Sequence, residues 1–222
     1  MPEVMIAGPV GRLEGRYKHH GNGNSPVALI LHPNPKQGGT MNNKMIYNLF
    51  HNFADRGYST LRFNFRGVGR SQGEFDNGEG ELNDAAAALD WLQALNPGAT
   101  EIMVVGFSFG AWVGMQLLMR RPEITEYISV APPANMYDFN FLAPCPNDGM
   151  IIQGSNDRIV NVESVNKLVE KLKDQRGATG VDYRIIEGAG HFFNNPEEME
   201  TLLSYVNDYI GVAAPQQLRK VA

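Results

Sequence analysis

The stretch Gly106–Gly110, with the sequence GFSFG, decides the fold expected for this chain. Four apolar residues, Ile102–Val105, precede it and are typical of a buried strand. Residues 111–121 have the pattern of a helix that closes with basic residues, and Pro122 follows them. The Gly-x-Ser-x-Gly pattern therefore falls on a sharp strand-to-helix turn, where glycine leaves room for a strained serine. We expect this turn to expose the hydroxyl of Ser108 as a nucleophile beside a helix N-terminus; an ordinary Gly/Ser loop is the alternative.

The composition limits the classes of protein and of partner. The chain has 222 residues, of which 43% are hydrophobic and 19% charged, as in a soluble globular protein. This length suits one α/β domain, and we expect residues 1–222 to form a single domain. The net charge of −5 disfavours nucleic acid and anionic membranes as partners. Because Cys145 is the only cysteine, an internal disulfide is excluded and a Cys/His metal cluster is disfavoured, so we expect no metal and no cofactor.

The sequence also bears on the location of the protein. The first residues, Met-Pro-Glu-Val, lack a basic segment followed by a long apolar run, so no signal peptide is expected. No apolar stretch approaches the length of a membrane span. We therefore expect a cytoplasmic protein with no membrane partner.

Apolar runs bounded by turn residues alternate with amphipathic stretches along the chain. They predict strands at 4–7, 12–17, 27–31, 58–65, 102–105, 124–130, 150–154 and 181–187. They predict helices at 42–56, 111–121, 162–175 and 196–210, with a further helix that ends at Leu95. This alternation is typical of an α/β fold with a mostly parallel central sheet and helices on both faces. Residues 211–222 are expected to be loose or used in a contact between chains.

One irregular stretch, residues 131–148, is rich in aromatic side chains. It is too short to form a separate lid domain. It predicts either one wall of a substrate pocket or a part of the ordinary core.

Candidate functional residues follow several of the predicted strands. Asn34, Gly67, Ser108, Asp157 and His191 all fall at carboxyl ends of strands, where ligands of such sheets bind. A serine hydroxyl needs a base within hydrogen-bond reach, and that base needs a group to orient it. Asp157 and His191, each in a turn after a strand, are the candidates for the orienting acid and the base.

Three segments resemble the nucleophile, acid and histidine segments of the α/β-hydrolase superfamily. They are GFSFG at 106–110, GSNDRIV at 154–160 and GAGHFF at 188–193. Their order along the chain, serine before aspartate before histidine, is also the order in that superfamily. The resemblance covers about residues 4–210 and implies an α/β-hydrolase fold without a large lid.

A narrower resemblance involves HPNP at 32–35, GGTMNNK at 38–44 and RFNFRGVG at 62–69. These segments are similar to those of small bacterial α/β-hydrolases without a cap domain. That group is related to dienelactone-hydrolase-like and prolyl-peptidase-like enzymes. Many relatives have His-Gly where this chain has His32-Pro33, and we expect His32 to brace its loop rather than to act as a base.

The resemblance implies a role for each site residue. Ser108 attacks a carbonyl carbon, His191 takes its proton and later gives it to the leaving group, and Asp157 stays ionised and orients the imidazole. The backbone N–H of Phe109 is implied as one oxyanion donor. For the second donor we expect the N–H of Asn34, because this residue lies between two prolines that have none.

Together these features predict a serine hydrolase of the carboxylesterase type that acts on a small ester. A small peptidase or amidase with the same triad is an alternative, and Arg66 or Arg70 is then a candidate anchor for a peptide carboxylate. Acyl transfer is a further alternative, since it passes through the same acyl-enzyme. A non-catalytic ligand binder is the alternative from another class. A homo-oligomer is also left open.

Overall fold

The computed structural model describes residues 2–21, 23–142, 145, 147–176 and 180–213. The strands are β1 (Glu3–Gly8), β2 (Gly11–Lys18), β3 (Val27–Leu31), β4 (Ser59–Phe63), β5 (Ile102–Phe107), β6 (Glu126–Val130), β7 (Asp148–Gly154) and β8 (Val181–Ile186). The helices are α1 (Lys44–Asp55), α2 (Glu79–Ala94), α3 (Phe109–Arg120), α4 (Val162–Arg176) and α5 (Pro196–Ala213), with a short 3-10 helix η1 (Pro35–Gln37).

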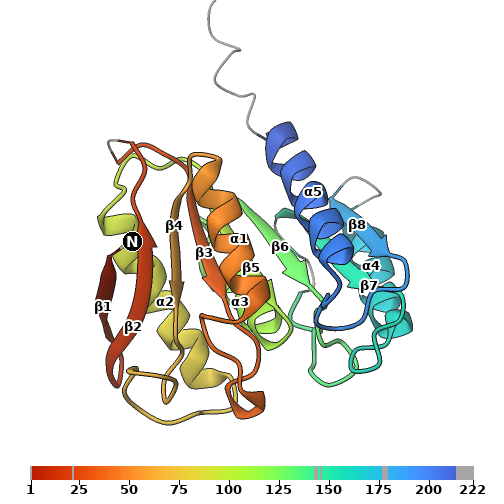
Figure 1. Cartoon of the computed structure of the whole chain (residues 1–222), viewed down its shortest axis with the longest axis horizontal. Helices are drawn as coiled ribbons and strands as arrows, with labels where there is room; N and C mark the ends of the chain where they lie inside the picture. The colour runs from red at the N-terminus through yellow and green to blue at the C-terminus, as the bar shows by residue number, and fades with distance from the viewer. Residues whose placement is uncertain (1, 22, 143–144, 146, 177–179, 214–222) are drawn as a thin grey trace, which may run out of the picture.

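Within the described residues the strands form one eight-stranded sheet in the order β1-β2-β4-β3-β5-β6-β7-β8 (Figure 1). The pairs β1–β2 and β2–β4 are antiparallel. The five remaining pairs are parallel. The prediction of a mostly parallel α/β sheet is therefore confirmed, and the two antiparallel strands lie at one edge of it.

Helices cover both faces of the sheet, because successive side chains of a buried strand point to opposite sides. In β5, Val104 joins a core formed with α2, α3 and α4. Its neighbours Met103 and Val105 join a second core formed with α1 and α5, the two helices in front of the sheet in Figure 1. The central strand β3 is buried along its whole length, as expected for a strand covered on both faces.

Several predicted boundaries are wrong by one or more residues, and hydrogen bonds explain two of them. Helix α1, expected from residue 42, begins at Lys44 and is capped by Asn43, whose carboxamide oxygen accepts from the N–H of Met45 at 2.9 Å. The strand expected at 58–65 ends at Phe63. It ends early because the next backbone groups turn toward other partners; the Phe65 N–H, for example, donates to a histidine ring.

Helix α5 is longer than the sequence pattern predicts. Residues 211–213 continue the helix to Ala213, so the expectation of a loose tail from residue 211 is wrong for these three positions. Residues 214–222 lie outside the described residues. Among the described helices, none is long and apolar enough to cross a membrane.

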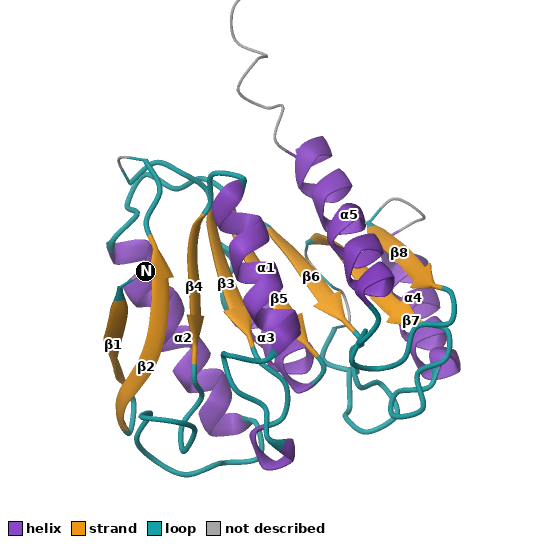
Figure 2. Cartoon of the chain, viewed as in Figure 1, coloured by secondary structure: helices purple, strands orange, loops and turns teal. Residues whose placement is uncertain are grey.

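The carboxyl ends of the parallel strands meet at one edge of the sheet. Figure 2 shows long loops gathered at this edge. The loops that follow the parallel strands, β3 to β8, all begin at these carboxyl ends. Residues far apart in the sequence therefore meet there.

Candidate active site

Ser108 occupies the sharp turn between β5 and α3. Its backbone has φ 54° and ψ −119°, a conformation that residues other than glycine rarely adopt. The flanking glycines leave no room for a side chain: a Cβ on Gly106 would lie 2.3 Å from the carbonyl oxygen of Gly110. A Cβ on Gly110 would lie 2.3 Å from the carbonyl oxygen of Leu31 at the end of β3. The glycines therefore permit both the strained turn and the close approach of α3 to β3.

The structure brings Ser108, His191 and Asp157 together. The Nε2 atom of His191 lies 3.1 Å from the Ser108 hydroxyl, and its Nδ1 atom lies 2.7 Å from a carboxylate oxygen of Asp157. The three residues follow β5, β8 and β7, so the parallel sheet supplies the frame that aligns them. All three residues are buried, so Ser108 is less exposed than the sequence predicts.

Both oxygens of the Asp157 carboxylate accept hydrogen bonds. One oxygen accepts from the backbone N–H groups of Ile159 and Val160, both at 2.8 Å. The other accepts from His191 and, at 3.1 Å, from the Gln153 side chain. Burial alone would raise the pKa of Asp157, but the hydrogen bonds from His191 and the backbone outweigh burial and hold that pKa below its ordinary value. Because the ionised carboxylate can only accept, the proton on the imidazole lies at Nδ1 and Nε2 is free to accept the serine proton.

His32 braces the loop after β3, as the sequence predicts. Its Nε2 atom accepts from the Phe65 N–H at 3.0 Å, so its proton is on Nδ1 and is donated to the Pro33 carbonyl at 2.7 Å. Burial lowers the pKa of His32 to about 4, despite the opposing bond to Pro33, so the ring is neutral. Since the peptide bond is trans, the Asn34 N–H points away from the anchored Pro33 carbonyl. His32 thus sets the direction of the Asn34 N–H.

Near the elbow, the backbone N–H groups that lack a partner within the described residues include those of Asn34 and Phe109. Phe109 is the first residue of α3, where an N–H has no acceptor in its own helix. The close contact of Gly110 with Leu31 and the His32 carbonyl places the start of α3 against the loop that carries Asn34.

The Asn34 side chain is held at both of its polar atoms. Its oxygen accepts from the Lys36 N–H at 2.8 Å and caps η1. Its nitrogen donates to the Tyr137 hydroxyl at 3.3 Å. The sequence placed Tyr137 in a stretch that was either pocket wall or core, but nothing in the sequence pointed to this contact, because it joins loops that follow two strands far apart in the chain.

Aromatic rings flank the site on two sides. Tyr137 stacks on Trp112 with 4.3 Å between ring centroids, and both rings pack against Phe109. On the other side, Phe192 packs edge-on against His191 at 5.1 Å. Within the stretch 131–148, Phe139 and Leu142 are buried in the core, as one of the two predictions for this segment has it; residues 143, 144 and 146 lie outside the described residues.

The two arginines considered as peptide anchors are engaged elsewhere. Arg66 is buried and makes two side-chain bonds to Asp84, at 2.8 and 3.0 Å. Arg70 pairs with Glu3 at the exposed edge of the sheet. Both arginines brace loops, so neither is free to bind a substrate carboxylate.

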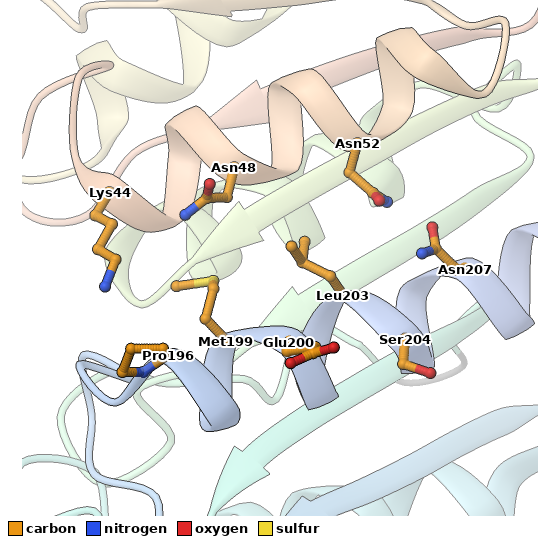
Figure 3. A pocket seen from close by; sticks show the side chains of 9 residues that line it. All are labelled: Lys44, Asn48, Asn52, Pro196, Met199, Glu200, Leu203, Ser204 and Asn207. Atoms are coloured by element: carbon orange, nitrogen blue, oxygen red, sulfur yellow. The ribbon is translucent and has the colours of Figure 1, made fainter.

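Two cavities lie near these elements. One, of about 500 Å³, is lined by His191 and neighbouring loop residues. A larger groove of about 550 Å³ runs between α1 and α5 (Figure 3). It is lined by carboxamide and apolar side chains such as Asn48, Asn52 and Leu203, and by none of Ser108, Asp157 and His191. In the described parts of the chain, no group of three or more His, Cys, Asp or Glu side chains is arranged to hold a metal ion.

Comparison with known proteins agrees with this architecture. Residues 11–147 match the model of the X-Pro dipeptidyl-peptidase (S15) family, and residues 124–213 match that of the prolyl oligopeptidase family. A protein of unknown function from Agrobacterium tumefaciens, ATU1826, described as a putative α/β-hydrolase, is 55% identical, with a TM-score of 0.90 and 95% of each chain covered.

Two further solved structures are serine hydrolases or their homologues. An α/β serine hydrolase homologue from Coxiella burnetii is 34% identical, with a TM-score of 0.84, over 94% of this chain and 97% of that one. XC6422 from Xanthomonas campestris, an α/β serine hydrolase without a lid, is 30% identical, with a TM-score of 0.85, over 96% of this chain and 95% of that one. The chain therefore belongs to the α/β-hydrolase superfamily and, within it, to the S15 family, with the architecture of a serine hydrolase that has no lid.

Proposed function

We propose that this protein is a serine esterase that cleaves small carboxylic esters through an acyl-enzyme on Ser108. One observation carries the proposal: Asp157, His191 and Ser108 form a hydrogen-bonded line with distances of 2.7 and 3.1 Å. A line of acid, imidazole and hydroxyl in the tautomer described above is the arrangement that turns a serine into a nucleophile.

In the first half of the reaction the Ser108 oxygen attacks the ester carbonyl carbon, and its proton passes to Nε2 of His191. The carbonyl oxygen becomes negative and accepts from the N–H groups of Phe109 and Asn34. The bond to the leaving oxygen then breaks, and His191 returns the proton to that oxygen, so an alcohol departs. Asp157 stays ionised throughout and stabilises the imidazolium.

In the second half a water molecule gives its proton to His191 and attacks the acyl-enzyme carbonyl. The bond to the Ser108 oxygen breaks, and the proton on His191 restores the serine hydroxyl. The carboxylic acid is released, and no atom of the enzyme is consumed.

Amide hydrolysis is the second candidate, because both matching family models are those of peptidases. We favour esters, since the two arginines predicted as anchors for a peptide carboxylate, Arg66 and Arg70, are both engaged in ion pairs. An acyl transfer would use the same acyl-enzyme with an alcohol or amine in place of water.

The proposal is tested by labelling with a fluorophosphonate probe, which reacts with activated serines without any assumption about substrate. Wild type and the Ser204→Ala control, which removes an exposed serine on α5, are expected to label equally. Ser108→Ala is expected to lose all labelling while keeping its thermal midpoint. Labelled protein is then assayed on 4-nitrophenyl esters of increasing acyl length and on aminoacyl 4-nitroanilides. A folded wild type that does not label would contradict an activated serine, and faster turnover of the anilides would favour the peptidase candidate.

A further inference from the structure

The cavity of about 500 Å³ beside His191 has the chemistry of an anion site on an apolar frame. Arg158 lines it together with Ile159 and Phe192, two of the large apolar side chains that the structure leaves exposed. Glu198 is the other charged residue that lines it. The cavity lies between the turn that carries Asp157 and the loop that carries His191.

The turn that carries Arg158 is held in place by its neighbours. The Asp157 carboxylate accepts from the N–H groups of Ile159 and Val160. The Ile159 carbonyl accepts from the Asn135 side chain at 2.9 Å. These bonds fix the backbone directly after Arg158, next to the acid that orients His191.

The Arg158 guanidinium makes no ion pair and no hydrogen bond with any residue in the described parts of the chain. Glu198 differs, because its carboxylate accepts from the Asn195 N–H at 3.4 Å and lies in the first turn of α5, where the helix dipole favours a negative charge. Arg158 is thus the charged group of this cavity that is available to a ligand.

The position beside His191 indicates which part of a substrate enters the cavity. In the proposed reaction His191 gives its proton to the leaving oxygen, so groups lodged beside this histidine belong to the leaving group. An arginine binds a carboxylate with two parallel hydrogen bonds, and flat apolar groups pack on Phe192 and Ile159.

We propose that Arg158 selects esters whose leaving group carries an anionic substituent, a carboxylate on a short apolar or aromatic frame. This inference rests on the proposed function, because it assigns the cavity by the proton that His191 delivers. It names the substrate class that the fold and the triad leave open.

The test compares two chromogenic substrates that differ by one carboxylate: 4-nitrophenyl acetate and 3-carboxy-4-nitrophenyl acetate. The measured quantity is the ratio of kcat/KM for the carboxylated ester to that for the neutral ester, so differences in intrinsic reactivity cancel between variants. Arg158→Ala is expected to lower this ratio about two- to fivefold, the size of an exposed ion pair, and Arg158→Glu is expected to lower it further. The kcat/KM for the neutral ester is expected to change less than about twofold, since this ester makes no ion pair.

The matched control is Arg56→Ala. Arg56 is an exposed arginine at the end of α1, just before β4 begins and so at the amino ends of the parallel strands. Its substitution is expected to leave the ratio unchanged. Raising the salt concentration should shrink the wild-type ratio and leave the Arg158→Ala ratio constant, because salt screens an exposed charge pair. An unchanged ratio in Arg158→Ala would overturn the inference.

A binding measurement separates this inference from the proposed function. Titration calorimetry with 3-carboxy-4-nitrophenol, the carboxylated leaving group itself, needs no turnover. Binding to wild type that weakens about two- to fivefold in Arg158→Ala supports the anion site even if neither ester is cleaved, in which case only the proposed reaction fails. No difference in binding between wild type and Arg158→Ala would overturn the anion site even if both esters are cleaved.

Discussion

The side-chain nitrogen of Asn34 donates a hydrogen bond to the hydroxyl of Tyr137 at 3.3 Å. This contact joins the loop after β3 to the segment after β6, and Tyr137 in turn stacks on Trp112 in α3. The proposed oxyanion site is thereby tied to two elements that carry none of the triad residues. Since the hydroxyl accepts from Asn34, its own proton is left for another acceptor.

Tyr137→Phe removes only this hydroxyl and keeps the stacked ring. We expect kcat on a small ester to fall about three- to tenfold, the worth of one hydrogen bond, with KM and the thermal midpoint almost unchanged. The control is Tyr183→Phe, which removes a hydroxyl bonded to Asn166 at 2.7 Å, with no contact to the triad. Steady-state kinetics of both variants checks the prediction, and a pure stability loss without a kcat effect would refute a positioning role for Tyr137.

The Asn34 N–H can be removed with little change to the backbone. Asn34 has φ −54°, within the range of proline, so Asn34→Pro deletes the donor in a compatible conformation. Asn34→Ala is the control, because it loses the same side chain and keeps the N–H. We expect Asn34→Pro to have a kcat about 10²–10³-fold below that of Asn34→Ala, the usual loss for one oxyanion donor. Equal rates for the two variants would show that the second donor lies elsewhere.

His32 predicts a pH dependence of stability. Burial holds its folded pKa at about 4, below the ordinary 6.5, so the unfolded chain binds a proton first as the pH falls. The stability from the neutral ring is thus complete above pH 6.5 and is lost as the pH falls toward 4. Over this window the unfolding free energy is expected to drop by about 3 kcal/mol from this group alone.

Urea unfolding at several pH values measures this slope, with His32→Asn as the comparison. The asparagine amide can still donate to the Pro33 carbonyl but does not titrate. We expect the variant to be less stable at pH 7, since the Phe65 N–H loses its acceptor, and to show a shallower slope between pH 6.5 and 4. Asp157 contributes at lower pH. Because its pKa is lowered, the stability that its ionised form contributes is lost only as the pH falls below the ordinary pKa of a carboxyl. Parallel slopes in the two proteins would show that His32 does not titrate in this way.

Gly39 is expected to control the geometry of the Asn34 loop. A Cβ at this position would lie 2.0 Å from the Pro33 carbonyl oxygen and 2.7 Å from that of Asn34. Gly39→Ala must therefore shift the Pro33–Asn34 peptide, and we expect about 1–3 kcal/mol of lost stability together with reduced kcat. Gly211→Ala, where nothing lies within 4 Å of the added Cβ, is the control and should be neutral or slightly stabilising. Denaturation curves and ester kinetics test both variants; a fully active, stable Gly39→Ala would contradict the argument.

The sequence alone was sufficient for the alternation of strands and helices and for the turn at 106–110. These features depend on local patterns: β-branched apolar runs, amphipathic spacing, and glycines at a turn that admits no Cβ. The same patterns place Ser108, Asp157, His191 and Asn34 after strands, and parallel strands bring such residues to one edge of the sheet. Helix ends were less predictable: Asn42 and Asn43 are both good caps, and Asn42 is instead bonded to Arg62.

The tertiary structure decided which side chains touch. It alone paired Asn34 with Tyr137, committed Arg66 to Asp84 and Arg70 to Glu3, and left Arg158 free among the described residues beside His191. The physical reason is that these contacts join loops from non-adjacent parts of the chain. Their partners depend on the order of the strands in the sheet and on the path of each loop, whereas turns, strands and helices depend mainly on residues a few positions apart.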